Sequence, residues 1–461
     1  MKLERGKFYY LYSRREHPLF ILSTRAFFLL QYFCFARARK MMIATETQQL
    51  HHHRLASSRL ASTSVRSRRD EPFRRLQHRA SSSLHFSVSS SSTPPEILKS
   101  TSSPSISSIV GDYYQFANHS CYYERKGDAK RANVQVIFLH GFGVGTFHYT
   151  KQLIGLGSEE VNSSRTCAWS MDICGQGKSW PKRREDVAEF EYSLDSWRDQ
   201  VEYFIREVVL KAADGSGENE EVKIVLAGNS LGGKLALYVS ATCEDLIDGI
   251  VLLNATPFWG FLEKRVSFLT KENDFIVKLT QPYWDNFRSK ENVRRLLNLV
   301  YADESKIEES LIEDIIAPTE NEHAIRAFIS TFTSPKASRM SYDKMLEVIR
   351  DRNDSIKVAM CYGREDPWVV PLWGQRLKRV VTNAKYYELS PAGHCPHDEA
   401  PECVNAVIRS LIDEWFSTAE AASPPKSIDG VSIELVDGSP RNVFEKLDYW
   451  KDRYLSSSAM M

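Results

Sequence analysis

Short apolar runs alternate with helix-length amphipathic stretches from about residue 115 to residue 417. Strands buried on both faces of a parallel sheet carry apolar residues almost without interruption, whereas half-exposed strands alternate. The runs therefore predict strands of a mostly parallel sheet. They are NVQVIFLH (133–140), TCAWSMDI (166–173), VKIVLAG (222–228), GIVLLNA (249–255), IKVAMCYG (356–363) and AKYYELS (384–390).

A helical pattern lies between these runs. In DSWRDQVEYFIREVV (195–209), the apolar residues Trp197, Val201, Phe204 and Val208 recur at spacings of four, three and four, which is one face of a helix. Alternating strands and helices predict an α/β fold with right-handed crossovers.

The alternation stops once, over some ninety residues with helical patterning and no convincing strand. We interpret this stretch as an inserted helical cap. The expected division is a first core part at 112–257, the cap at 258–350, a second core part at 351–417, and a linker with an amphipathic tail at 418–461. In the tail Val443, Leu447, Trp450 and Tyr454 again share one helix face, expected to dock on the protein's own surface rather than on a membrane or partner.

Composition sets the first 95 residues apart from the rest. Residues 42–93 contain eight arginines, thirteen serines and three acidic residues, as is typical of a plastid or mitochondrial transit peptide, and the serine run before Pro94 favours the plastid. The apolar stretch 18–36 carries Arg25 in its middle, which disfavours a membrane span. It is more simply explained as an upstream extension, with translation starting at Met41 or Met42.

Charge is distributed unevenly along the chain. Residues 1–93 carry 17 lysines and arginines against 5 acidic residues, whereas the whole chain has a net charge of +1, so the remainder is at −11. Nucleic-acid binding requires clustered cations, so the acidic remainder of the chain excludes nucleic acid as a partner.

The strongest chemical signal is VLAGNSLGGKLAL (225–237), which contains the G-x-S-x-G pattern between a predicted strand and a predicted helix. That context is the one in which a nucleophilic serine occupies a strained turn. Gly228 and Gly232 supply the room that such a turn needs. Ser230 is therefore the candidate nucleophile.

A serine hydroxyl needs a base, and the base needs an orienting acid. Where this turn occurs, the chain order is serine, acid, histidine. Asp366 and His394 each come just after a predicted strand, at the sheet edge where open α/β sheets place their sites. Glu365 is an alternative acid, although a surface ion pair is the simpler expectation for it.

The glycine-rich segment LHGFGVG (139–145) follows the first strong strand directly. Its turn can aim backbone N–H groups into the cleft, and we expect those of Phe142 and Leu231 to bind a developing oxyanion. The segment matches neither phosphate-binding glycine pattern. Asp172, in the turn MDICGQGKS (171–179), is interpreted as a residue that shapes the neighbouring loop.

Two histidines and a cysteine lie close together in LSPAGHCPHDEAP (389–401). A metal site would need further ligands, which no H-E-x-x-H motif or cysteine cluster supplies, so we expect no metal. Cys395 lacks the elbow context of a nucleophile, and His397 is expected to be a structural loop residue.

These motifs resemble the plant α/β-hydrolases that include pheophytinase and chlorophyll dephytylases. The resemblance covers about residues 112–415 and is carried by HGFGVGTFHY, AGNSLGGKLALY, LLNATPFWGF, YGREDPWVVPLWG and ELSPAGHCPHDEAPE. It implies an α/β-hydrolase fold with a helical cap, and Ser230, Asp366 and His394 as the catalytic triad. It also implies removal of phytol from chlorophyll-type pigments by ester hydrolysis in the plastid.

The sequence thus predicts a chloroplast serine esterase, in the stroma or peripheral at the thylakoid or envelope membrane. Its partner is a small lipid or pigment ester, and the chemistry needs no cofactor. The alternatives are a carboxylesterase for other prenyl or acyl lipid esters, and a non-catalytic hormone receptor on the same fold, against which the transit peptide argues. An aspartate-nucleophile dehalogenase or epoxide hydrolase is excluded because the elbow residue is Ser230.

Overall fold

The computed structural model describes residues 108–157, 166–214, 221–257, 274–333, 339–352, 355–417 and 422–436. The predicted transit peptide (1–95) and the predicted tail helix around Val443 to Tyr454 lie outside these residues. All elements below belong to the described part of the chain.

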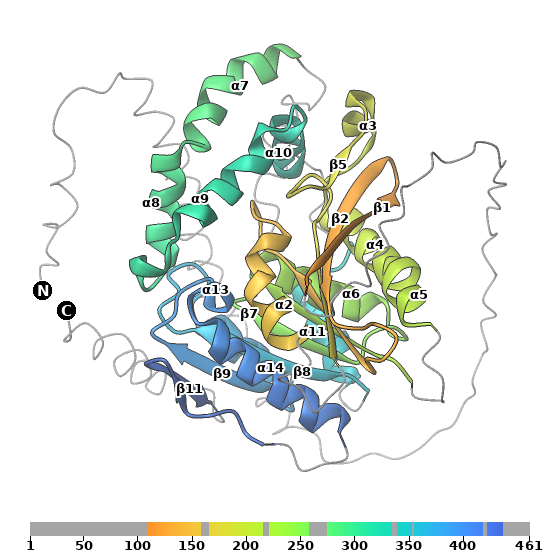
Figure 1. Ribbon diagram of the computed structural model, residues 1–461, viewed down its shortest axis with the longest axis vertical. Helices are drawn as coiled ribbons and strands as arrows, with labels where there is room; N and C mark the ends of the chain where they lie inside the picture. The colour runs from red at the N-terminus through yellow and green to blue at the C-terminus, as the bar shows by residue number, and fades with distance from the viewer. Residues whose placement is uncertain are drawn as a thin grey trace, which may run out of the picture. The chain divides into compact units, whose positions relative to one another are not determined.

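One mixed sheet organises this part of the molecule (Figure 1). Its strands run in the order β1-β2-β4-β3-β6-β7-β8-β9-β11-β10, and β5 pairs with β2. The six strands from β4 to β9 in this order pair in parallel, and the strands at both edges pair antiparallel. The strands are β1 Val110–Phe116, β2 His119–Lys126, β3 Val134–Leu139, β4 Thr166–Met171, β5 Trp180–Pro181, β6 Lys223–Asn229, β7 Gly249–Leu253, β8 Lys357–Gly363, β9 Lys385–Ser390, β10 Ser427–Ile428 and β11 Val431–Leu435.

Helices cover both faces of the sheet. One hydrophobic core lies between the sheet and α4, α6, α11 and α12, and the other lies between the sheet and α2 and α14. The helices are η1 Thr146–Tyr149, α2 Thr150–Gly157, α3 Arg184–Glu189, α4 Leu194–Phe204, the π-helical turn η2 Ile205–Val209, α5 Leu210–Ala213, α6 Leu231–Thr242, α7 Asp274–Phe287, α8 Lys290–Val300, η3 Glu304–Lys306, α9 Glu309–Ile316, η4 Ala317–Glu320, α10 Ala324–Thr333, α11 Tyr342–Asp351, α12 Leu372–Val380, α13 Pro396–Glu399 and α14 Pro401–Phe416. Among them, none has both the length and the apolar content of a membrane-spanning helix.

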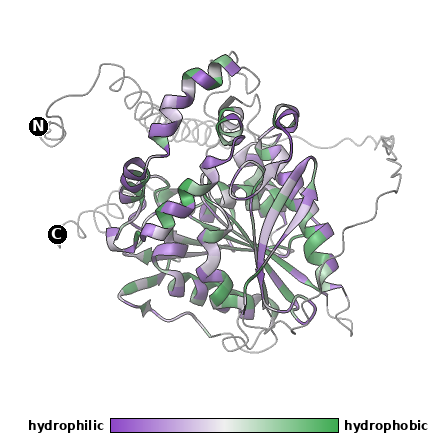
Figure 2. Cartoon of the chain, turned by 45° about the horizontal axis from the view of Figure 1, so that its top comes forward, coloured by the Kyte–Doolittle hydropathy of each residue, from purple (hydrophilic) through white to green (hydrophobic). Residues whose placement is uncertain are grey.

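Strand β3 shows why its sequence is apolar throughout. Val136 and Phe138 point into the core under α2 and α14, whereas Ile137 and Leu139 point into the core under α4 and α6. All residues of β3 are buried. Figure 2 shows hydrophobic residues along the strands and a mixture of hydrophobic and hydrophilic residues on the helices around them.

The six predicted strands are confirmed, each within about two residues of its expected bounds, and the predicted α/β class with them. The amphipathic stretch 195–209 is helical, with Trp197, Val201 and Phe204 fully buried. Five strands of the described chain were not expected. β1 and β2 form a hairpin before the first predicted strand, β5 is a two-residue strand paired with β2, and β10 and β11 lie where a linker was expected. Strand β11 pairs with β9, so residues 431–435 extend the sheet rather than leave it.

Helices α7 to α10 lie above the sheet in Figure 1, within the segment expected to be the cap. Helix α11 departs from that expectation, because Met345, Leu346 and Ile349 pack into the main core. The same helix leads directly into β8, so it is a crossover helix of the sheet. The described cap is therefore α7–α10, and the outer limits of the domains stay a prediction.

Tyr149 joins the ends of two central strands beneath the site described next. Its hydroxyl donates to the Leu139 carbonyl at the end of β3 (3.1 Å) and accepts from the Asn229 N–H at the end of β6 (2.9 Å). The side chain is fully buried. Its two hydrogen bonds therefore join the ends of β3 and β6 in the interior.

We predict that Tyr149→Phe lowers the free energy of unfolding by about 1–3 kcal/mol, because it removes two hydrogen bonds of a fully buried hydroxyl. Urea unfolding followed by circular dichroism measures this. Tyr113→Phe, at a half-exposed tyrosine of β1, is the control and should change the free energy of unfolding by less than about 0.5 kcal/mol. Equal effects of the two substitutions would contradict the bridging role of Tyr149.

Candidate active site

Ser230 occupies the turn between β6 and α6 with a backbone φ of +53° and ψ of −114°. A positive φ is unfavourable for a residue with a Cβ atom, so the fold must hold it in place. Its N–H donates to the Leu253 carbonyl and its carbonyl accepts from the Thr256 N–H, each at 3.0 Å. The neighbouring strand β7 therefore fixes the turn on both sides of the serine.

Two glycines make this turn sterically feasible. A Cβ atom on Gly232 would overlap the carbonyl oxygen of Leu139, and one on Gly228 would overlap the backbone of Gly232. The end of β3 and the start of α6 thus pass closer than any side chain permits. This crowding explains why the motif has glycine on both sides of Ser230.

Asp366 and His394 are hydrogen-bonded to each other. The distance from the Nδ1 atom of His394 to the Oδ2 atom of Asp366 is 2.7 Å, and both residues are buried. A carboxylate can only accept, so Nδ1 carries the proton and Nε2 is left as the acceptor. This arrangement suits an imidazole that removes a proton from a hydroxyl.

The carboxylate of Asp366 has three further donors. The Nδ2 atom of Asn254 lies 2.7 Å from Oδ2, and the N–H groups of Trp368 and Val369 lie 2.7 Å and 3.0 Å from Oδ1. Asn254, just after β7, also accepts from the Gly363 N–H at 2.8 Å. Together these donors offset the cost of burying a charge.

Asn229 connects the serine turn to the histidine loop. Its Nδ2 atom donates to the His394 carbonyl at 2.8 Å and to the Leu253 carbonyl at 3.1 Å. Within the described residues no hydrogen bond joins the Ser230 hydroxyl to the His394 imidazole. Catalytic contacts are often loose before substrate binds, so this does not separate the two residues functionally.

The predicted oxyanion loop runs beside Ser230. A Cβ atom built on Gly141 would stand 3.6 Å from the Cβ atom of Ser230. The Gly143 N–H donates to the Oε1 atom of Gln176 at 2.7 Å. Phe142 stays the predicted donor of this loop. The second candidate, Leu231, is the first residue of α6, where N–H groups lack intrahelical acceptors.

Asp172 binds the backbone at the end of this loop and shapes it, as expected. Its carboxylate accepts from the Thr146 N–H at 2.6 Å and from the Lys178 N–H at 2.7 Å. Burial raises the pKa of Asp172 to about 7, against the lowering effect of these two hydrogen bonds. The preceding His140 is also structural: burial lowers its pKa to about 4, and its Nε2 atom accepts from the Ile173 N–H at 3.0 Å.

Two neighbours of the predicted triad have other partners. The Glu365 carboxylate accepts from the Ser390 hydroxyl (2.6 Å) and the Ala392 N–H (2.8 Å), so it stabilises the turn before His394 and is not the surface ion pair that was expected. His397 is buried, and its Nε2 atom lies 3.2 Å from the Nδ1 atom of His148. In the part of the chain that the structure describes, neither Asp366 nor His394 is a hydrogen-bond partner of these two side chains.

Asn229, Asn254 and Glu399 have structural roles that were not expected from the sequence; the Glu399 carboxylate accepts from the Gly393 N–H, next to His394, at 2.9 Å. Asn229 and Asn254 lie within quoted motifs, at the carboxyl ends of predicted strands, and that position was the available signal. Within the ranges that the structure describes, no three His, Cys, Asp or Glu side chains are grouped as metal ligands would be.

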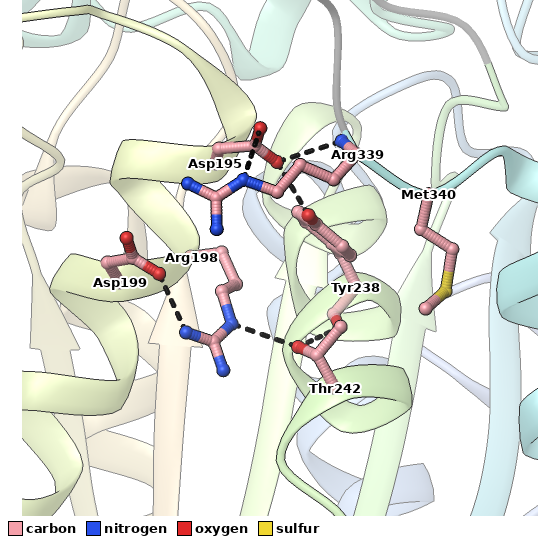
Figure 3. Close-up of a pocket in the computed structure, with 7 residues that line it drawn as sticks. All are labelled: Asp195, Arg198, Asp199, Tyr238, Thr242, Arg339 and Met340. Atoms are coloured by element: carbon pink, nitrogen blue, oxygen red, sulfur yellow. Dashed lines mark hydrogen bonds and ion pairs between the residues drawn. The ribbon is translucent and has the colours of Figure 1, made fainter. Parts of the chain in front are cut away.

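A pocket of about 260 Å³ lies elsewhere, against α4 and the second half of α6 (Figure 3). Its charged groups pair with each other, as in Asp195 with Arg339 (3.3 Å) and Arg198 with Asp199 (2.6 Å). Tyr238, which lines it, is eight residues after Ser230, or about 12 Å along the helix. This pocket is thus separate from the candidate site.

Comparison with known proteins identifies the family. The model of the alpha/beta hydrolase family matches residues 136–406. Chloroplastic pheophytinase of Arabidopsis thaliana is 36% identical over 339 residues, which cover 66% of this chain and 66% of that protein. The uncharacterized hydrolase YugF of Bacillus subtilis (strain 168) is 26% identical over 204 residues, covering 44% of this chain and 70% of its own.

Among solved structures, a serine hydrolase involved in carbazole degradation (CarC) matches with a TM-score of 0.48 and 20% sequence identity, covering 67% of this chain and 100% of its own. The family model spans more than half of the chain, from Val136 in β3 to Ala406 in α14. The chain therefore belongs to the alpha/beta hydrolase family and is similar, within it, to chloroplastic pheophytinase.

Proposed function

We propose that this protein is a serine esterase that hydrolyses the phytyl ester of chlorophyll-type pigments. The observation that carries the proposal is the buried Asp366–His394 hydrogen bond next to a serine held at a positive φ. Ser230 is the nucleophile, His394 the base and Asp366 the group that orients it.

The reaction would use groups of the chain alone. The Ser230 oxygen attacks the ester carbonyl, and its proton passes to Nε2 of His394. The oxyanion is stabilised by the N–H groups of Phe142 and Leu231. The imidazolium then protonates the departing phytol oxygen, leaving an acyl group on Ser230. Water, deprotonated by the same imidazole, releases the acid and restores the serine.

Similarity to pheophytinase and the chemistry of the cap support a phytyl ester as substrate. Trp284, Phe287 and Phe328 of the cap form an aromatic cluster, with ring centroids 5.0–5.9 Å apart. Phe142 of the oxyanion loop meets this cluster, because its ring lies 5.8 Å from that of Phe328. Burial of a twenty-carbon chain offers roughly ten kcal/mol or more, at about 0.8 kcal/mol per CH₂. An apolar surface at the reacting centre could capture part of it.

The plastid is the proposed location. The arginine- and serine-rich segment 42–93 and the chloroplast location in the name of the Arabidopsis relative both support it. A peripheral position at a thylakoid or envelope membrane would give access to a membrane-dissolved pigment, and the stroma is the alternative.

We predict that Ser230→Ala and His394→Ala each lower the turnover of a phytyl ester by about 10⁴-fold or more, because nucleophile and base act as a unit. His397→Ala is the matched control and should keep most of the activity, since this histidine contacts His148 rather than the triad. Phytol release from pheophytin a, chlorophyll a and a fatty-acid phytyl ester, followed by chromatography, measures all three variants.

Serine-dependent release from a pigment supports the proposal and ranks the pigments. Release only from the fatty-acid ester would assign the protein to other prenyl lipids. No release by the folded wild-type protein would favour a receptor on the same fold.

A second prediction concerns the cap. Phe328→Ala should raise the KM for a phytyl ester about tenfold while leaving a short acetyl ester nearly unaffected, since removing apolar contacts costs about 1–3 kcal/mol of discrimination. Steady-state kinetics on both esters give the comparison. Phe416→Ala, at the end of α14, is the control for general destabilisation. Loss of activity toward both esters alike would argue against a substrate contact.

A further inference from the structure

The loop that carries His394 is held by the cap as well as by the sheet. The His394 N–H donates to the carbonyl of Val300, the last residue of α8, at 2.8 Å. A Cβ atom on Gly393 would overlap this carbonyl and lie 2.8 Å from the Ala302 nitrogen. Only glycine therefore permits the cap backbone to approach the residue next to His394. Figure 1 shows the lower end of α8 coming down beside α13.

Glu399 bridges the two segments. Its Oε1 atom accepts from the Gly393 N–H at 2.9 Å, and its Oε2 atom accepts from the Ala302 N–H at 2.7 Å. The side chain is buried, and both oxygens are used by backbone donors. One carboxylate thus holds the residue before His394 and the residue that lies two positions after α8.

Further contacts join the same two segments. The Tyr301 hydroxyl, next to Ala302, donates to the Oδ2 atom of Asp398 at 2.8 Å. Cys395 packs into the cap core together with side chains of α8 and α9. The histidine loop therefore meets the cap through backbone, carboxylate and apolar contacts over residues 393–399.

We propose that Glu399 is a positioning residue that makes the placement of the His394 imidazole depend on the seating of the cap. The inference rests on the proposed function, because it assigns His394 as the base. The cap reaches both halves of the site, since Phe328 meets the oxyanion loop and the end of α8 meets the histidine loop. Seating of the cap would then complete the site.

The link should be sensitive to pH. Burial raises the pKa of Glu399 to about 7, although backbone hydrogen bonds lower it. Below that pH the protonated carboxyl presents an O–H to one of two N–H donors. Burial raises the pKa of two groups that face it, the Tyr301 hydroxyl and the Cys395 thiol, well above their usual values. The neighbouring Asp398 carboxylate forms an ion pair with Lys151 at 2.8 Å.

The test uses Glu399→Gln in the full chain and the rate at which diisopropyl fluorophosphate labels Ser230. The glutamine side chain keeps one oxygen, which can accept from one backbone N–H. Its NH₂ group is itself a donor and faces the second N–H without an acceptor. Small misplacement of a catalytic group is costly, so the labelling rate should fall between about 10-fold and 100-fold. The kcat for phytol release should fall by a similar factor with little change in KM.

The matched control is Asp248→Asn. This carboxylate also accepts a backbone N–H, from Ile224 at 2.9 Å, but it lies just before β7, at the amino ends of the central strands. Its labelling rate should equal that of the wild type. The ratio of wild-type to Glu399→Gln rates should also approach one as the pH falls below about 7. A ratio that stays constant with pH, or a Glu399→Gln rate equal to the wild-type rate, overturns the proposal.

If Glu399→Gln does not fold, Tyr301→Phe provides a second test of the same link. It removes one hydroxyl between the cap and the same loop and should slow labelling several-fold, whereas an unchanged rate would overturn the link between cap and histidine. Labelling does not require a phytyl ester. Wild-type protein that is labelled but releases no phytol would disprove the substrate and leave the positioning role intact.

Discussion

The buried carboxylate of Asp366 is the constraint on which the site depends. It is 1% exposed, and an unpaired charge at such depth would be prohibitively unfavourable. Its four donors come from Asn254 after β7, from its own turn after β8, and from His394 after β9. The hydrogen bonds to this one carboxylate therefore fix the ends of three neighbouring parallel strands, β7, β8 and β9, relative to one another. The His394 imidazole is oriented by one of these bonds.

The serine side of the site follows from a second constraint, the close packing of backbone around the elbow. Leu139 at the end of β3 lies close to Gly232, while Leu253 at the end of β7 and Thr256 after it bind the backbone of Ser230. Asn229 then joins this side to the carbonyl of His394. The Asn229 amide thus connects the serine turn with the histidine loop, and the cap contacts both the glycine-rich loop and the histidine loop.

Much of this could be predicted from the sequence, because each feature leaves a local signal. Strands buried on both faces are continuously apolar, and the elbow requires its glycines within five residues. The edge strand β1 is mostly exposed, so it carried no such pattern. Asn254 and Glu399 were not predicted for another reason. Asp366, a partner of Asn254, lies 112 residues away in the chain, and Ala302, the cap partner of Glu399, lies 97 residues away, so no spacing rule connects them. Glu365 was misjudged similarly, since its partners follow the next strand.

The most direct test of the account is to trap the covalent intermediate. Wild-type protein is mixed with pheophytin a, the reaction is stopped with acid within its first turnovers, and the peptide that contains Ser230 is weighed by mass spectrometry. The account predicts a pheophorbide acyl group on Ser230, together with free phytol. Phytol released without any modification of that peptide, and equally well by Ser230→Ala, would contradict it.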